Sequence, residues 1–447
     1  MASFIIQTAP LMKSLSVALA LTGAAYLAAA ILLALTQASL GSALFFTCAA
    51  TMAAAYVVML WRVSRERTSR RQLIAAFVVA LAFRVPLVFP RVAPESDMVR
   101  YLWDGRIQTL GYSPYAVTPD DPAVAWTHTD ETRAMPSHRA RSPYPPAAQL
   151  FFRLVVTIHD STRAMKTALT FCDVLTIIVL WRWLIVTGRS EWLALAYAWN
   201  PLVILEIAHS GHIDALGALW IVASAYWLAR RRTALATIAF GLAVATKLLP
   251  IVLAPLYVGR IRMRDALGAG ALLAALYLTF SRGGTIEVGT IPSVIQNVRF
   301  NSELFRFVMR LVGNPQRAAA VAVSAGLVTA MWARWRLDAG NPAAWAWPMA
   351  IALAFGPVIY PWYLLYFTPF LLTTATIPLA AWTLTVIPIY IVWELAFKHG
   401  ARWAVPPSVM MLEYAIPLAL AAAIFFWRLR TQQNGTRQHH VEPGRTP

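Results

Sequence analysis

The stretch that decides the fold is QLIAAFVVALAFRVPLVFPRVAPESDMVRYLWDG, residues 72–105. It opens with an apolar run that is long enough to cross a bilayer and ends near Pro90. The eleven residues from Glu95 to Gly105 then place three carboxylates and an arginine at the edge of that run. Ionisable groups at a membrane boundary are costly and usually functional. The stretch therefore predicts a membrane protein with chemistry at the bilayer surface.

The composition extends this interpretation to the whole chain. Of its 447 residues, 59% are hydrophobic and only 13% are charged, whereas a soluble domain is typically about a quarter charged. We expect an all-α polytopic membrane protein, a bundle of about 12 to 14 transmembrane helices, because a spanning helix needs roughly 20 apolar residues and such runs recur. Several apolar segments are short or interrupted by proline, which breaks helices. The segments lie near residues 13–36, 41–62, 72–90, 165–187, 190–208, 212–229, 233–247, 248–258, 265–281, 315–335, 342–357, 360–375, 376–395 and 408–428.

The net charge of +18 gathers in short basic loops between the apolar segments. Such loops keep to the cytoplasmic side of a membrane, so the pattern favours a topological role and no nucleic-acid partner is expected. With these loops inside, both termini are cytoplasmic. Four segments then share the outer face of the membrane: 91–162, 209–214, 282–314 and 359–362.

The chain divides into three regions. We expect an N-terminal transmembrane hairpin with a basic loop (1–71), a catalytic transmembrane core (72–430) that includes the outer loop 91–162, and a disordered polar tail (431–447). Within the outer loop, residues 147–159 are typical of an amphipathic helix. The sequence has no Walker A loop, Rossmann fingerprint, HExxH or G-x-S-x-G motif. Any activated donor must therefore reach the site through the membrane.

Asp97 is the leading candidate for a catalytic group. It follows a membrane segment by a few residues, with Glu95 and Arg100 beside it. A carboxylate at a half-buried interface can take a proton from a hydroxyl, since burial raises its pKa. The alternative is that Glu95 and Asp97 cap a helix that begins near Met98.

The residues after Asp97 have helical spacing. Arg100, Trp103 and Asp104 share one helix face, and together with Tyr101 they suit a sugar ring, which has an apolar face and polar hydroxyls. The alternative for Arg100 and Asp104 is a surface ion pair of little energetic value.

A second polar cluster, His209-Ser210-Gly211-His212-Ile213-Asp214, lies between two apolar segments with almost no loop. Its two histidines and aspartate suit a divalent metal such as Mg or Mn, or equally a phosphate or a sugar. The alternative is a hydrogen-bonded turn in which Asp214 caps the next helix. Glu206, one turn earlier on an apolar helix, is costly enough to suggest a role.

Cations and aromatic residues complete the candidate site. Lys247 ends an apolar segment on the outer side, where it either snorkels or holds a lipid phosphate. Arginines of the next outer segment suit phosphate oxygens because the guanidinium is a planar fork; they include Arg282, Arg299, Arg306 and Arg310. Tyr360-Pro361-Trp362-Tyr363 is either an interfacial aromatic belt or a platform for a sugar or an isoprenoid.

These elements resemble the GT-C superfamily of integral membrane glycosyltransferases. The resemblance is closest to the bacterial polyprenyl-phosphate-mannose-dependent mannosyltransferases, the glycosyltransferase 87-like group. It rests on the order and spacing of short motifs between about residues 90 and 375. They are Glu95-x-Asp97 with Arg100-Tyr101-x-Trp103-Asp104-Gly105, Gly111-Tyr112-Ser113-Pro114-Tyr115, Tyr144-Pro145-Pro146 with Gln149, His212-Ile213-Asp214, Lys247-Leu248-Leu249-Pro250 and Pro361-Trp362-Tyr363.

The resemblance implies a polyprenyl phosphate sugar as donor, a glycan or lipid as acceptor, and inversion at the anomeric carbon. It implies that Asp97 is the base and that Glu95 supports it. Lys247 with an outer arginine, Arg299 or Arg306, would hold the donor phosphate. His209, His212 and Asp214 would line the sugar or phosphate pocket, with or without a metal. Tyr144, Tyr360, Trp362 and Tyr363 would complete the substrate contacts.

The chain departs from the family pattern at its N-terminus. Two segments, 13–36 and 41–62, precede the one that leads into the acidic loop, and we interpret them as a hairpin outside the catalytic core. Two alternatives to mannosyl transfer stay open. One is a transporter or flippase of lipid-linked saccharides, and the other is the same fold transferring glucose or an aminopentose.

Overall fold

The structure is a computed structural model that describes residues 14–438, apart from 67, 91–95, 134, 136 and 282–288. The described residues form helices and no β-strand; their one isolated bridge joins Phe300 to Val358. Seven of the described segments are long and apolar enough to cross a membrane. The chain is therefore an all-α polytopic membrane protein, as the sequence predicts. These segments are α1 (Leu15–Thr36), α2 (Ala43–Arg65), α3 (Arg70–Val88), α7 (Thr162–Val186), α15 (Pro315–Arg336), Thr374–His399 and Pro407–Trp427.

Shorter helices and single turns fill the remaining predicted segments. The α-helices are α4 (Asp97–Thr109), α5 (Asp130–Arg133), α6 (Pro146–Ile158), α8 (Leu195–Ala198), α9 (Pro201–Ile204), α10 (Asp214–Ala229), α11 (Thr233–Thr246), α12 (Met263–Leu278), α13 (Ile291–Asn297), α14 (Glu303–Val312), α16 (Pro342–Ala354), α17 (Ile377–Thr385), α18 (Ile391–His399) and α19 (Pro407–Gln438). The 3-10 segments are η2 (Pro122–Thr127), η3 (Glu191–Ala194), η5 (Leu249–Tyr257), η6 (Pro361–Tyr366), η7 (Thr368–Phe370), η8 (Thr374–Thr376) and η9 (Ile387–Tyr390), and η4 (Leu205–His209) is π-helical.

Proline explains why several apolar segments are broken into short turns. Pro201, Pro250, Pro361 and Pro388 each stand at the first or second position of a short helix, where the missing N–H costs nothing. Each of the fourteen predicted segments coincides with a helix or with a chain of such turns. The expected 12 to 14 crossings would need these short and broken segments to cross as well as the seven long ones.

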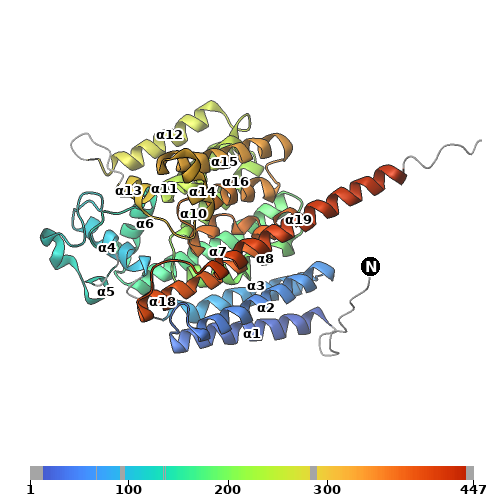
Figure 1. The fold of residues 1–447 in the computed structure, drawn as a ribbon, viewed down its shortest axis with the longest axis horizontal. Helices are drawn as coiled ribbons and strands as arrows, with labels where there is room; N and C mark the ends of the chain where they lie inside the picture. The colour runs from blue at the N-terminus through green and yellow to red at the C-terminus, as the bar shows by residue number, and fades with distance from the viewer. Residues whose placement is uncertain are drawn as a thin grey trace, which may run out of the picture.

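The long helices α1, α2, α3 and α19 run in roughly the same direction (Figure 1). In this view α1, α2 and α3 form a layer along one side, and α10 packs between α7 and α11 in the interior. The outer-loop helices α4 and α5 lie at one end, and the C-terminal end of α19 points toward the other. The polar loop is thus separated from the described C-terminus by the length of the bundle.

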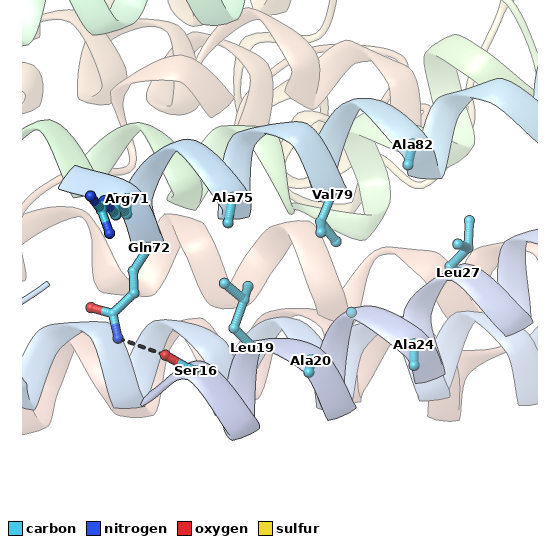
Figure 2. Close-up of a pocket in the computed structure, with 11 residues that line it drawn as sticks. Ser16, Leu19, Ala20, Ala24, Leu27, Arg71, Gln72, Ala75, Val79 and Ala82 are labelled. Carbon is cyan, nitrogen blue, oxygen red and sulfur yellow. Dashed lines mark hydrogen bonds between the residues drawn. The ribbon is translucent and has the colours of Figure 1, made fainter. Parts of the chain in front are cut away.

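The N-terminal hairpin packs against the core. Tyr26 of α1 stacks on Phe83 of α3 at 4.0 Å between ring centroids, and the Tyr56 hydroxyl of α2 donates to the Ala196 carbonyl at 2.8 Å. Small residues of α1 and α3 leave a groove of about 480 Å³ between these helices (Figure 2). At one end of the groove, Gln72 donates to the Ser16 hydroxyl at 2.9 Å.

Candidate active site

Asp97 is the first residue of α4, and its side chain is half-buried. The helix begins there because the Ser96 hydroxyl accepts a hydrogen bond from the Met98 N–H at 3.3 Å, which is the usual N-cap arrangement. Ser96 therefore caps the helix, and the Asp97 carboxylate makes no capping bond of its own. Glu95 lies outside the described residues.

The turn between η4 and α10 packs against the start of α4. The Ser210 N–H bonds to the Leu205 carbonyl at 2.9 Å, which closes a π-helical turn, a feature that is frequent at functional sites. Gly211 follows with φ of +76°, a conformation that L side chains rarely adopt. A Cβ on Gly211 would overlap the Met98 Cε. Only glycine therefore lets this turn approach Met98, the second residue of α4, so closely.

Lys247 and Asp214 form an ion pair at the centre of the candidate site. The Lys247 Nζ lies 2.6 Å from Asp214 Oδ1, and the same ammonium sits 3.7 Å from the centre of the Tyr363 ring. Asp214 is fully buried, whereas the Lys247 side chain is 21% exposed. The N-cap residue of α10 is Ile213, which makes no side-chain cap, and Asp214 is the first residue of the helix. Its carboxylate instead holds Lys247, so the capping alternative does not describe it.

The surroundings of Asp97 give it the properties of a base at neutral pH. Burial raises the pKa of Asp97 to about 6, and the Asp214 carboxylate also raises it. Lys247, a hydrogen bond from the Tyr144 hydroxyl and Arg100 act in the opposite direction. An acid with a pKa of about 6 is mostly deprotonated at neutral pH and can accept a proton reversibly.

His212 is held by a buried carboxylate and an aromatic ring. Its Nε2 lies 3.3 Å from Glu206 Oε2, and its imidazole stacks on Trp362 at 4.0 Å between centroids. The Tyr390 hydroxyl donates to Glu206 Oε1 at 2.5 Å. Glu206 carries a sequence signal, because it is an acid on an apolar segment. Tyr390 lies 184 residues after Glu206, and nothing in its local sequence marks it as a site residue.

The aromatic residues near His212 form a continuous row. Trp362 stacks on Tyr360 at 4.5 Å between centroids, and Tyr360 stacks on Phe300 at 4.6 Å. Within the loop 91–162, Tyr101 packs edge-on against Tyr144 at 5.0 Å. The ring contacts of His212, Trp362, Tyr360 and Phe300 therefore join three of the four segments predicted to share one face: 209–214, 359–362 and 282–314.

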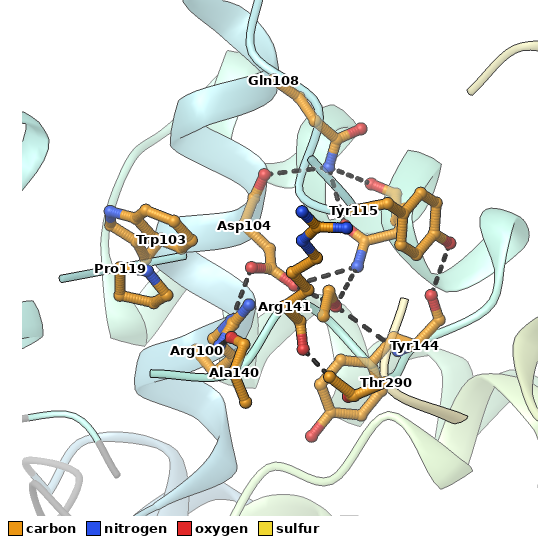
Figure 3. Close-up of polar contacts among 12 residues, drawn as sticks. Arg100, Trp103, Asp104, Gln108, Tyr115, Pro119, Ala140, Arg141, Tyr144 and Thr290 are labelled. Atoms are coloured by element: carbon orange, nitrogen blue, oxygen red, sulfur yellow. Dashed lines mark hydrogen bonds and ion pairs between the residues drawn. The ribbon is translucent and has the colours of Figure 1, made fainter. Parts of the chain in front are cut away.

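Three predicted substrate contacts lie in the core of the outer loop. The Asp104 carboxylate accepts from Arg100 Nε at 2.7 Å, from Ser142 Oγ at 2.5 Å and from Gln149 Nε2 at 2.9 Å (Figure 3). The Trp103 indole is fully buried and donates to Thr127 Oγ1 at 3.0 Å. The Arg100–Asp104 ion pair, which the sequence alternative places at the surface, is therefore buried. Arg100, Trp103 and Asp104 shape the loop around Asp97.

The predicted phosphate-binding arginines bond to protein groups. Arg299 donates to the carbonyls of its own turn, including that of Val298 at 2.6 Å, and Arg306 pairs with Glu303. Both line a small cavity of about 60 Å³ together with Phe300 and Trp403. Phe300 links this cavity to Tyr360 and so to the candidate site. Arg282 lies outside the described residues.

The donors of the second polar cluster do not converge on a metal site. His209 Nδ1 lies 3.2 Å from Ser210 Oγ, and His212 Nε2 faces Glu206. The Asp214 carboxylate pairs with the Lys247 ammonium. The part of the chain that the structure describes contains no group of three or more His, Cys, Asp or Glu residues that could hold a metal ion. We derive no step through a metal.

Comparison with known proteins adds the family. Residues 4–263, more than half of the chain, match the family described as alpha-(1->6)-mannopyranosyltransferase, N-terminal domain. The chain belongs to this family. The match confirms the resemblance to GT-C mannosyltransferases, and the chain is a membrane glycosyltransferase that transfers mannose. It begins at residue 4, so the family domain includes the N-terminal hairpin, and it reaches past Lys247. No curated protein matches the chain in sequence.

Proposed function

We propose that this mannosyltransferase uses a polyprenyl phosphate mannose donor and glycosylates an acceptor hydroxyl at the outer face of the bacterial inner membrane. The single observation that supports it most strongly is Asp97, whose pKa is raised to about 6, beside the Lys247–Asp214 pair where the apolar helices end. The absence of nucleotide-binding motifs in the sequence supports a donor carried by lipid. The basic loops of the opposite face support cytoplasmic termini.

In the proposed step, Asp97 removes the proton from the acceptor hydroxyl as its oxygen forms a bond to the anomeric carbon of mannose. The bond from that carbon to the phosphate oxygen breaks, and the electron pair leaves with the polyprenyl phosphate. The leaving group gains one negative charge during the step. A fixed positive charge stabilises this transition state more than the ground state, which is the role proposed for Lys247.

The remaining predicted contacts take their places around this step. Asp214 keeps the Lys247 ammonium in position. Arg306 would exchange Glu303 for a donor phosphate, and Arg299 would add its charge from the same cavity. The sugar would contact Tyr101, Tyr144, His209, His212, Tyr360, Trp362 and Tyr363.

The family description also bears on stereochemistry. Its members are described as forming an alpha-(1->6) linkage. If this chain forms an α-mannoside by inversion, its donor must carry mannose in the β configuration. The acceptor would be the primary 6-hydroxyl of a mannose residue, borne on a glycan or a glycolipid.

The test is mannosyl transfer by purified protein in lipid nanodiscs, with β-linked polyprenyl phosphate mannose and extracted cell-envelope lipids. We expect turnover by the wild-type protein and its loss in a folded Asp97→Asn variant. Equal turnover by the variant would assign the base to another residue. No turnover with the polyprenyl donor would overturn the choice of donor.

A further inference from the structure

The His212 imidazole contacts two side chains, those of Trp362 and Glu206. The Trp362 indole sets the plane of the ring, because the two rings are parallel within 9° at 4.0 Å. The His212 backbone N–H bonds to the Glu206 carbonyl at 2.9 Å. The side chain of the same glutamate faces Nε2 at 3.3 Å. The ring therefore cannot turn without losing the stacking or the carboxylate.

The two oxygens of Glu206 have different partners. Oε1 accepts the Tyr390 hydroxyl at 2.5 Å, which leaves Oε2 to face the imidazole. Tyr390 is itself held by Phe45 of α2, whose ring packs edge-on against it at 5.4 Å. Oε2 makes no hydrogen bond to a described residue, so its influence on the imidazole is electrostatic: a carboxylate 3.3 Å from Nε2 favours a proton on that nitrogen.

The other nitrogen, His212 Nδ1, is buried and has no hydrogen-bond partner among the described residues. Three more buried polar atoms of the site share this property, Glu206 Oε2, Asp214 Oδ2 and the Tyr366 hydroxyl. Buried polar groups are normally paired. Atoms left unpaired beside Lys247 are therefore suited to a polar ligand.

The tautomer determines which ligand Nδ1 can take. Lys247 pairs with Asp214, which follows His212 by two residues in the sequence. A second positive charge on the His212 imidazole is disfavoured beside this ammonium. A neutral imidazole with its proton on Nε2 presents a lone pair at Nδ1. A lone pair accepts a hydrogen bond from a hydroxyl and repels a phosphate oxygen. The geometry thus separates a hydroxyl contact at His212 from a phosphate contact at Lys247.

We propose that Tyr390 and Glu206 are positioning residues that hold His212 in the Nε2–H tautomer, so that Nδ1 accepts a hydrogen bond from a hydroxyl of the bound sugar. This inference rests on the proposed function for the identity of the sugar. It adds two residues to the site, and Tyr390 comes from outside the family-matched part of the chain.

The tautomer is tested directly by NMR of protein labelled with nitrogen-15 at histidine. The chain has eight histidines, and His212→Phe, which keeps a ring against Trp362, assigns the signal. We expect a neutral His212 with its proton on Nε2. In Glu206→Gln the side-chain amide donates to Nε2, so the proton should move to Nδ1. A wild-type proton on Nδ1 would overturn the proposal, and this experiment needs no donor.

The catalytic consequence is tested by a double-mutant cycle on mannosyl transfer. Tyr390→Phe should lower kcat/KM about 10-fold, the effect of one hydrogen bond, and Glu206→Gln should lower it further. Neither substitution should lower kcat/KM further in the His212→Phe background. Equal losses in both backgrounds would show a merely structural role and contradict the proposal.

Tyr56→Phe is the matched control, since it deletes a buried tyrosine hydroxyl bonded to a carbonyl on a neighbouring helix. It should leave kcat/KM unchanged. The Asp97→Asn variant separates the two proposals: activity in that variant alongside a coupled cycle would reject the proposed base and keep the His212 assignment.

Discussion

The Lys247 ammonium and the Asp214 carboxylate, 2.6 Å apart, join the residue that follows α11 to the first residue of α10. The carboxylate is fully buried, and the lysine side chain is 21% exposed. The lysine is thus the member of the pair that solvent reaches in the structure. A negatively charged ligand can reach the ammonium while the compensating charge stays fixed behind it.

Lys247→Met tests this arrangement. Removing the ammonium should lower kcat/KM by about 10²- to 10³-fold, as loss of a transition-state charge contact does. It also leaves Asp214 buried without its partner, which costs about 3–5 kcal/mol of stability. The Lys247→Met/Asp214→Asn double variant should recover thermal stability and stay inactive. Recovery of activity together with stability would contradict phosphate binding by Lys247.

The pH dependence of kcat/KM should reflect Asp97. Because the carboxylate form is the base, activity should rise with pH through a midpoint near 6. Tyr144→Phe removes a hydrogen bond that lowers the pKa of Asp97, so the midpoint should move to higher pH. The measurement is a pH–rate profile of both proteins, and a midpoint that moves to lower pH would contradict the assignment.

The thermal stability of the protein should change with pH in the opposite direction to its activity. The raised pKa of Asp97 means that folding favours the neutral acid, so this stabilising contribution is complete below the unfolded pKa and is lost as pH rises through about 6. Asp97→Asn should therefore raise Tm relative to wild type at pH 8 and change it little at pH 4. A variant that is less stable than wild type at pH 8 would show that the native carboxylate is favourably paired.

Gly211→Ala should disrupt the approach of the turn to α4. The substitution combines positive φ with an overlap at Met98, so we expect about 2–4 kcal/mol of destabilisation and a large loss of activity. Gly400→Ala is the matched control: its φ is +62° and a Cβ there meets nothing within 4 Å. It should cost only about 1–2 kcal/mol, measured by Tm, and leave activity intact.

Asp104→Asn separates loop structure from chemistry. The carboxylate accepts three side-chain hydrogen bonds in the loop core, and the amide cannot reproduce all of them. We expect faster proteolysis of the outer loop and a lower Tm, with activity falling in parallel. Asp97→Asn should instead lose activity without faster proteolysis. Loss of activity in a stable Asp104→Asn protein would return Asp104 to the substrate contacts.

The sequence predicts the helical segments well because apolar length and proline placement are local properties. It also brings together the segments of Asp97, Asp214 and Lys247, since charge patterning places them on one face. Side-chain roles within those segments were not predictable in the same way. Arg100 and Asp104 have the spacing of an exposed pair, but their burial comes from Ser142 and Gln149, which lie some forty residues further along the chain.

The same limit applies to the ends of helices and to distant partners. Ser96 and Asp97 are both good capping residues, and only the backbone geometry decides that Ser96 caps. The partner of Glu206 depends on how a distant segment packs, which no local pattern carries. Glycine at position 211 is compatible with many turns, and its necessity follows from the contact with Met98.

The aromatic row has a consequence for dissecting the protein into parts. Asp97, Asp214 and Lys247 all fall within the family-matched residues 4–263, so a fragment ending there would retain the proposed base and the ion pair beside it. Trp362 and Tyr390 would be missing, and with them the ring that fixes His212 and the hydroxyl that directs Glu206. Such a fragment would contain these charged groups without the residues that hold the rest of the site in place. Chimaeras between related proteins should therefore exchange residues 4–263 together with the part of the chain that contains Trp362 and Tyr390.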